Sequence, residues 1–351
     1  MNKIIENDCE QIIIEYKNQL KKLLGKKILI TGGGGFLLSY FTKMLIIYNK
    51  KNKKKINITI IDKFLDKTNP NFKIFNSSKN VFILKRDVSL IKNFNQNFNY
   101  IIHGASIASP VIYKKFPIET IKSNVNGLLN ILECYKKNKK LKSLIFMSSS
   151  EIYGDPDNAN IPTTEYYLGN VSCTGPRACY DESKRLGETI ATTFFKKYKL
   201  PIKIIRPFNV YGPGQKLDDG RIIPDIIKKI IEKRNIVLYS NGKSTRSFCY
   251  ISDQVRGLIE IMFKGKDGES YNVGNDKEVS IMEVSKLAIK LSNTNIKIKK
   301  KISRDKTFNI DSPKRRCPNI DKLKKINNWK PKINLKNGLL KTINSYKEAI
   351  N

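Results

Sequence analysis

Short apolar runs rich in β-branched residues alternate with longer amphipathic stretches over the first two-thirds of the chain. The short runs predict strands at Lys27–Thr31, Ile56–Asp62, Val81–Leu84, Tyr100–His103, Leu144–Ser148 and Ile202–Arg206. The stretches between them predict helices at Leu37–Tyr48, Pro117–Asn138 and Tyr180–Lys197. Regular alternation of strand and helix predicts an α/β fold with a doubly wound parallel sheet, in which ligands bind beyond the carboxyl ends of the strands.

The pattern becomes irregular after Arg206. Residues 209–214 contain the turn-forming residues of a loop, and a further helix is expected at Pro224–Lys233. We therefore expect residues 26–206 to form a cofactor-binding domain and residues 207–351 mainly a smaller C-terminal substrate-binding lobe, with segments around 248–275 returning to the first domain. Residues 1–25 have the apolar spacing of an amphipathic helix and are predicted to be a helical extension.

Composition narrows the class of protein. The 351 residues are 40% hydrophobic, enough for a large core, and contain no run of eighteen apolar residues that could span a membrane. The N-terminal acidic residues do not suit a signal peptide. Six scattered cysteines without a Cys-x-x-Cys pair indicate reduced thiols and a cytoplasmic location. A single histidine, His103, argues against a zinc site, so we expect no metal.

The formal charge of +35 suggests two kinds of partner, nucleic acid and anionic membrane. Its lysines are, however, spread over separate stretches (50–55, 136–140 and 299–301) and are not interleaved with aromatic residues. A base-stacking platform or a groove-reading helix would concentrate them. We therefore expect a solvated basic surface and neither a nucleic-acid nor a membrane partner. The positive field also favours an anionic nucleotide substrate.

A glycine cluster follows the first predicted strand and precedes a helix. Glycine lets the backbone approach a pyrophosphate, and the helix N-terminus supplies amide donors, as in Rossmann-type dinucleotide sites. Asp62 ends the second strand, where a carboxylate holds the ribose hydroxyls and repels a 2′-phosphate, so the pattern favours NAD over NADP. The predicted cofactor-binding residues are Gly32, Gly35, Phe36, Leu37, Asp62, Asp87, Val88, Ala105, Tyr180 and Lys184.

One position departs from this fingerprint. Leu38 stands three residues after Gly35, where glycine usually allows close packing of helix on strand. We expect the leucine to push the helix slightly off the sheet and to weaken NAD binding.

Tyr180 and Lys184 are four residues apart and share one face of a predicted helix. An ammonium group beside the phenol is expected to lower its pKa, so that it can take a proton from a sugar hydroxyl while nicotinamide takes the hydride. The strand at Leu144–Ser148 leads into Ser149, Ser150 and Glu151. A serine there can bind the sugar 4-OH. Glu151 is a second acid/base group, which chemistry at C5 or C6 of the sugar requires.

These motifs resemble the extended short-chain dehydrogenases/reductases that act on nucleotide sugars, and within them the UDP-glucuronate decarboxylases, or UDP-xylose synthases. The resemblance runs from about Lys26 to the C-terminus. Its most specific segments are 105–110, 150–155, 175–185, 219–221, 245–248 and 313–318.

The resemblance implies roles for individual residues. Ser149 matches the catalytic Thr or Ser, Glu151 the acid/base glutamate, Tyr180 the base and Lys184 its partner. Arg246 matches the arginine that faces the sugar carboxylate. The residues that match positions holding the nucleotide diphosphate are Asn209, Arg221 and Arg316. Asn124 matches the asparagine that supports the active-site strand. We also expect substrate contacts from Arg177, to the carboxylate, and from Tyr239, to the nucleobase. Ser150, next to Ser149, is a further candidate catalytic residue.

The implied reaction oxidises C4, loses CO2 from the 4-keto sugar, reprotonates C5 and returns the hydride, giving UDP-xylose and regenerated NAD. The resemblance also implies a homodimer formed through the helices Pro117–Asn138 and Tyr180–Lys197.

Three alternatives remain open. A 4,6-dehydratase shares the 4-keto intermediate; many dehydratases have Asp where this chain has Ser150, which favours decarboxylation, although GDP-mannose dehydratases carry Ser-Glu there. A 4-epimerase needs no glutamate at position 151. A non-catalytic basic nucleotide- or nucleic-acid-binding protein has no use for the full set Ser149, Glu151, Tyr180 and Lys184.

Overall fold

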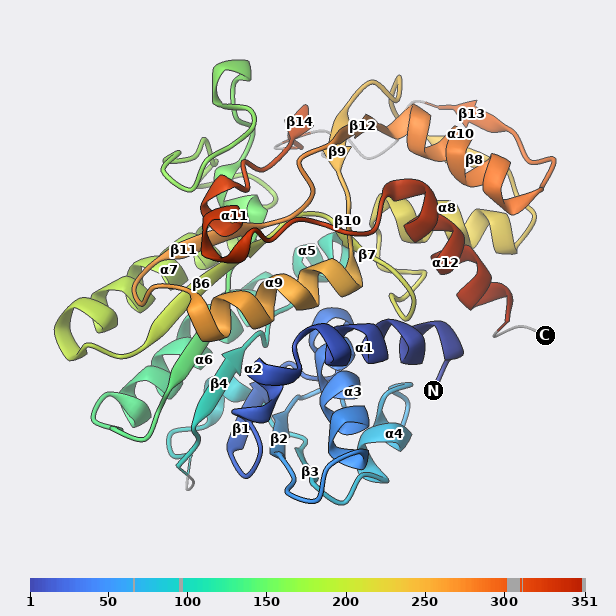
Figure 1. The fold of residues 1–351 in the computed structure, drawn as a ribbon. Helices are drawn as coiled ribbons and strands as arrows, with labels where there is room; N and C mark the ends of the chain where they lie inside the picture. Colours follow the sequence, from blue (N-terminus) through green and yellow to red (C-terminus); the bar gives the residue numbers. More distant parts are fainter. Residues whose placement is uncertain (66, 95–96, 302–309, 311, 349–351) are drawn as a thin grey trace.

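A computed structural model describes residues 1–65, 67–94, 97–301, 310 and 312–348 of the chain. Within these residues a central sheet of seven parallel strands has the order β11-β6-β5-β4-β1-β2-β3 (Figure 1). The strands are β1 (Lys27–Thr31), β2 (Asn57–Ile61), β3 (Val81–Leu84), β4 (Tyr100–His103), β5 (Ser143–Met147), β6 (Ile202–Pro207) and β11 (Ser270–Val273). The order reverses between β1 and β4, and the predicted doubly wound α/β fold is confirmed.

Both faces of the sheet are covered. Helices α3 (Phe36–Lys50) and α9 (Ile251–Lys264) lie on one face, and α6 (Pro117–Tyr135) and α7 (Ala178–Tyr198) on the other (Figure 1). Successive side chains of a strand point to opposite faces, so Ile28 and Ile30 join one hydrophobic cluster and Leu29 joins the other. Continuous burial of this kind explains why the strands read as unbroken apolar runs.

The predicted strands and helices lie within one to three residues of the observed ends. Two elements without a predicted range, β11 and α9, belong to residues 248–275 and add a strand and a covering helix to the central sheet. The remaining short elements of the first two-thirds are α4 (Phe72–Asn76), η1 (Val88–Leu90), α5 (Pro110–Lys115), η2 (Ser150–Tyr153) and η3 (Asn158–Asn160).

The segment after β6 contains the further helices α8 (Ile222–Ile231), α10 (Ile281–Ser292), α11 (Asp321–Asn327) and α12 (Leu335–Lys347), of which α11 packs on α9 and β11. Its short strands pair as β7 (Val210–Tyr211) with β10 (Cys249–Tyr250), β8 (Ile236–Leu238) with β13 (Ile298–Lys300), and β9 (Thr245–Ser247) with β12 (Glu278–Ser280) and β14 (Arg315–Arg316). The domain limits at residues 25 and 206 stay predictions. In the described part of the chain, every helix is too short or too polar to cross a bilayer.

The N-terminal extension forms α1 (Lys3–Glu15) and α2 (Lys17–Lys21), and α1 packs on α3, α9 and α12 (Figure 1). The buried carboxylate of Asp8 accepts hydrogen bonds from the hydroxyls of Tyr40 (2.8 Å) and Tyr250 (2.7 Å), and from Lys341. One side chain of the extension thus ties together α3, β10 and α12.

Candidate active site

The glycine loop between β1 and α3 requires glycine for two separate reasons. Gly32 has φ of +72°, and a Cβ at this position would lie 2.7 Å from the backbone nitrogen of Ala105. Gly35 caps the N-terminus of α3, whose first turn contains Phe36 and Leu37. The loop therefore offers bare backbone and a helix N-terminus at the carboxyl end of β1, an arrangement that fits a pyrophosphate.

Asp62 follows β2 and faces this loop. One carboxylate oxygen accepts from the amide of Gly34 (2.8 Å), and the other from the amide of Phe64 (2.9 Å). Burial raises the pKa of Asp62. Asp87 caps η1 by accepting from the amide of Ser89 (3.0 Å), and Val88 is buried beside it. These residues fit the adenosine half of NAD at the positions where the sequence predicted it.

Leu38 is buried at the base of α3, and its neighbour explains how it fits. A Cβ built on Gly104, which directly follows β4, would lie 2.5 Å from Cδ1 of Leu38. The leucine therefore fills space that Gly104 leaves free, a compensation that sequence reasoning missed. The predicted weakening of NAD binding stays a prediction.

Tyr180 lies in the first turn of α7 and is buried, with its ring stacked on Tyr113 at a centroid distance of 5.2 Å. Lys184 is one turn further, 5.9 Å from the centroid of the Tyr180 ring, and its amine donates to the carbonyl of Met147 (2.8 Å). The sequence predicted a lowered tyrosine pKa, and for the polypeptide alone this is wrong. Burial raises the pKa of Tyr180 to about 12, although a hydrogen bond with Ser149 opposes the rise.

Burial acts on Lys184 in the opposite sense and lowers its pKa to about 7. A low dielectric disfavours both the phenolate and the ammonium, so the pair is held near its neutral forms. Ser149 precedes η2 and accepts from the amide of Glu151 (3.2 Å), while Ser150 is buried at the start of η2.

Glu151 is surrounded by three arginines from separate elements. Arg177 precedes α7 and donates to one carboxylate oxygen, and Arg316 of β14 donates to the other. Arg246 of β9 is paired in register with Arg316. Burial by itself raises the pKa of Glu151, but the charges of Arg177, Arg316 and Arg246 outweigh it and hold the pKa below its usual value. Burial, followed by the charge of Arg316, lowers the pKa of Arg246 to about 10.

Arg177 and Arg316 both bind Glu151 in the structure, and their predicted contacts to the substrate carboxylate and to the diphosphate stay predictions. Arg316 was expected on the diphosphate, and the structure places its guanidinium on Glu151. Arg177 forms ion pairs with Glu151 and, through Nε, with Asp181 (3.3 Å). Within the described residues Arg246 has no carboxylate partner at salt-bridge distance, and it donates to the carbonyl of Thr245 (2.8 Å).

Most of the other residues with predicted roles make contacts within the protein. Asn209 has φ of +37° and donates to the carbonyl of Ser247 (3.0 Å), and Arg221 binds Asp219 and the carbonyl of Ala108 (2.8 Å). Asn124 donates to the hydroxyl of Ser183 (2.8 Å) on α7. Tyr239 follows β8 and is 44% exposed.

Sequence reasoning missed Asp181 as a functional residue. Asp181 stands between Tyr180 and Lys184 in the sequence, and no spacing rule distinguishes it from Glu182, the acidic residue next to it. The structure buries it beside Arg177 and leaves its Oδ1 without a hydrogen-bond partner among the described residues. Other buried polar atoms without a partner in the described part of the chain include Ser106 Oγ, Tyr113 OH, Asn124 Oδ1 and Arg316 Nε. Within the described residues, unpartnered buried polar atoms also occur away from this centre, at Gln254 and Glu260 of α9 and at Trp329.

The model of one protein family, described as the NAD dependent epimerase/dehydratase family, matches residues 28–274. The chain belongs to this family. Its N-terminal helix α1 and its helices α10 to α12 lie outside the matched residues.

Curated members of the family with similar sequences are UDP-glucuronic acid decarboxylases. Decarboxylase 3 of Arabidopsis thaliana is 39% identical over 239 residues, which cover 68% of this chain and 67% of that protein. Decarboxylase 5 of the same plant is 36% identical, covering 83% of this chain and 81% of its own length. For decarboxylase 1 of Arabidopsis thaliana the identity is 35%, and the match covers 84% of this chain but only 65% of that protein.

Solved structures of the family have the same fold. A UDP-glucuronic acid 4-epimerase variant from Bacillus cereus, in complex with UDP-4-deoxy-4-fluoro-glucuronic acid and NAD, superposes with a TM-score of 0.78 at 25% identity, covering 92% of this chain and 99% of that one. An epimerase from Methanothermobacter thermautotrophicus has a TM-score of 0.81 at 24% identity, covering 96% and 97%.

Proposed function

We propose that this protein is an NAD-dependent UDP-glucuronate decarboxylase that forms UDP-xylose. The observation that carries the proposal is the excess of positive charge around Glu151. Three guanidiniums, of Arg177, Arg246 and Arg316, face two carboxyl groups, and one of these, Asp181, has a raised pKa. A substrate that brings its own carboxylate balances this charge. Family membership and the decarboxylase relatives support the same choice.

NAD, held at the glycine loop and Asp62, would accept the hydride from C4 of the sugar and return it after CO2 has left. Bound NAD would place its positive nicotinamide beside Tyr180 and favour the phenolate, and in that form Tyr180 would take the proton of the 4-OH and later give it back. Ser149 is hydrogen-bonded to the phenol, and the Lys184 amine lies over its ring. The C6 carboxylate is then β to a ketone, so the C5–C6 electron pair can move toward C4 as CO2 leaves. Glu151 is held ionised by Arg177 and Arg316. In the proposed complex it faces C5 and C6 of the sugar, and its negative charge keeps the substrate carboxylate out of the position that Glu151 occupies.

The test is to incubate the purified protein with UDP-glucuronate labelled at C6. We expect labelled CO2 and a UDP-pentose in equal amounts, with Tyr180→Phe at background. A parallel panel of UDP-, dTDP-, GDP- and CDP-hexoses distinguishes the alternatives by their products, water loss for a dehydratase and an epimer for an epimerase. Water loss or epimerisation without CO2 release from UDP-glucuronate contradicts the proposal.

We also propose a homodimer built from the outer faces of α5, α6 and α7. Apolar side chains gather there at exposed positions: Val111, Ile112, Phe116, Ile118, Ile121 and Leu186. Burying such a face against a second copy removes it from water. Light scattering should give twice the mass of the chain. Ile121→Glu should reduce it to the mass of one chain, whereas Leu340→Glu, on the remote helix α12, should leave it unchanged. A single-chain mass for the wild-type protein rejects this assembly.

A cytoplasmic location is a further proposal, supported by the cysteines. All six lie in the described residues and are free, three of them buried. Free thiols persist in a reducing compartment. Fractionation of cells that express the full chain tests it, and recovery in a secreted or organellar fraction would contradict it.

A further inference from the structure

The decarboxylation takes up one proton from solvent in every turnover, and an acid/base group at the sugar such as Glu151 must itself be resupplied with that proton. Tyr180 borrows the proton of the 4-OH and returns it, so it contributes none over a full cycle. Loss of CO2 from a carboxylate leaves an electron pair at C5, which must gain a proton, and the balance is UDP-glucuronate plus H⁺ giving UDP-xylose plus CO2. One proton therefore enters the site in every turnover. This reasoning rests on the proposed function.

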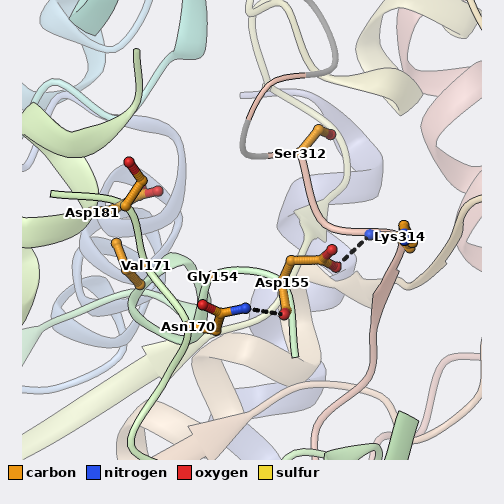
Figure 2. A pocket seen from close by; sticks show the side chains of 8 residues that line it. Gly154, Asp155, Asn170, Val171, Asp181, Ser312 and Lys314 are labelled. Atoms are coloured by element: carbon orange, nitrogen blue, oxygen red, sulfur yellow. Dashed lines mark hydrogen bonds between the residues drawn. The ribbon is translucent and has the colours of Figure 1, made fainter. Parts of the chain in front are cut away.

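A cavity of about 360 Å³ lies beside Asp181 (Figure 2). It is lined by Gly154, Asp155, Asn170, Val171, Ser172, Asp181, Ser312 and Lys314. In Figure 2 Asp181 is on the opposite side of the cavity from Ser312 and Lys314. A polar cavity of this size can hold several water molecules, because one water occupies about 30 Å³.

Asp181 joins this cavity to the catalytic residues. It is 3% exposed, and its Oδ1 has no hydrogen-bond partner among the described residues. Its Oδ2 accepts from Nε of Arg177 (3.3 Å), and another nitrogen of the same guanidinium binds Glu151. One oxygen is thus held in place next to Glu151, while the other is buried and without a hydrogen-bond partner among the described residues.

The charges around Asp181 change during the reaction in the direction that first favours its protonated form and then its ionised form. The groups that face it are Glu151 of η2, Arg177 before α7, Arg316 of β14, Tyr113 of α5, and Tyr180 and Cys179 of α7, with Asp155 and Lys314 across the cavity. Burial, and then the charge of Glu151, raise the pKa of Asp181. A bound substrate carboxylate adds a further negative charge and favours the protonated form. When that carboxylate leaves as CO2, the arginines lose an anion and favour ionised Asp181.

We propose that Asp181 takes a proton from water in this cavity and supplies it, along the Glu151 side of the sugar, for the protonation of C5. Asp181 acts through its neighbours and is a proton-supplying residue, distinct from Glu151 and Tyr180, which face the sugar. Loss of CO2 triggers the release of the proton, and solvent restores it before the next turnover.

The central variant is Asp181→Asn, which keeps the shape and the contact to Arg177 but cannot carry the proton. Its matched control is Glu182→Gln, which removes one negative charge from the next residue of α7, where the side chain is 37% exposed. With the NAD-bound enzyme and UDP-glucuronate, we expect kcat of Asp181→Asn to fall by roughly 100-fold with KM little changed, and Glu182→Gln to remain close to wild type.

The pH dependence gives a readout that a structural role would not move. Asp181 supplies its proton from the protonated form, so wild-type kcat should fall as the pH rises through its raised pKa. Asp181→Asn should lose this alkaline limb, and its solvent deuterium isotope effect on kcat should increase. In Asp181→Ala, added formate should enter the enlarged cavity, replace the carboxyl group and restore activity in a saturable way. An infrared difference spectrum between wild type and Asp181→Asn, without substrate, should show a protonated carboxyl band at neutral pH.

The outcomes separate this proposal from the proposed function. If wild type releases no CO2 from UDP-glucuronate, the proposed function fails. If wild type is active but Asp181→Asn keeps the alkaline limb and formate does not rescue Asp181→Ala, Asp181 is structural and the inference is overturned. A raised KM with unchanged kcat also overturns it, because the residue would then bind substrate.

Discussion

The molecule contains two buried clusters built from similar groups, one around Asp8 and one around Glu151. In the first, a single carboxylate receives hydrogen bonds from Tyr40, Tyr250 and Lys341, and its side chain is 4% exposed. In the second, the Glu151 side chain is 21% exposed and shares its site with three arginines and Asp181. The Asp8 cluster holds α1 against the rest of the chain, and the Glu151 cluster belongs to the candidate active site.

The difference lies in how completely the polar atoms are satisfied. Neither carboxylate oxygen of Asp8 lacks a partner, whereas Asp181 Oδ1 and Arg316 Nε have none among the described residues. A satisfied cluster contributes rigidity, and an unsatisfied one keeps binding capacity at a cost in stability. The two clusters therefore differ in their unmatched polar atoms and not in the presence of buried charge.

The sharpest test of this contrast is Glu151→Gln. The amide keeps the volume but cannot exchange a proton or balance the arginines. We expect kcat/KM for UDP-glucuronate to fall by about 100- to 10,000-fold. The free energy of unfolding should change less than in the Asp8 variant below, since Glu151 is partly exposed. Activity assays and urea unfolding on the same samples measure both. Retained turnover would refute a role for Glu151 in the reaction.

The reverse effect is predicted for Asp8→Ala. Two buried phenol hydroxyls lose their acceptor, and Lys341 loses its partner, so the free energy of unfolding should fall by about 3 kcal/mol. The kcat of the molecules that remain folded should stay within about twofold of wild type. Glu6→Gln, which alters an exposed carboxylate on the same helix, is the control. If Asp8→Ala lowers kcat more than stability, the two clusters are not separate in function.

Variants of Leu38 and Gly104 show whether the packing of one against the other, near the cofactor site, affects only stability, as is expected of the Asp8 cluster. Leu38→Gly should cost about 2–5 kcal/mol through the cavity it leaves. Gly104→Leu alone should be destabilising because its side chain would meet Leu38. The double variant should recover part of both losses. Urea unfolding gives the coupling energy, and NAD titration shows whether the exchange changes affinity. Additive losses would show that the two positions do not share one space.

Much of the fold followed from the sequence because the buried parallel strands leave unbroken apolar runs, as at Lys27–Thr31. Residue types also placed Tyr180, Lys184, Ser149 and Glu151 close together, since strand ends and helix starts meet at one edge of the sheet. What could not be predicted depends on contacts between distant segments. Arg316 reaches Glu151 across 165 positions, and no local pattern distinguishes a phosphate-binding arginine from one that binds a glutamate. The predicted direction of the Tyr180 pKa shift was wrong because burial, which no local pattern reveals, outweighs the hydrogen bond with Ser149 and the charge of Arg221.

The smallest expected effect concerns the pH dependence of stability at Lys184. Its pKa in the folded protein is lowered to about 7 from 10.5, so the folded state binds this proton less tightly than the unfolded state does. Its contribution to stability therefore increases as the pH rises from about 7 to 10.5 and is absent below 7. Lys184→Met removes that slope, and the variant should be more stable than wild type near pH 7 while its activity is lost. Urea unfolding of both proteins between pH 7 and 9 gives the difference between their free energies of unfolding at each pH. The surface lysines contribute equally to both proteins and cancel in this difference. If the variant is less stable than wild type at pH 7, the hydrogen bond from Lys184 to the Met147 carbonyl stabilises the fold by more than burial of the charge destabilises it. Lys184 would then have a structural role like that of Asp8.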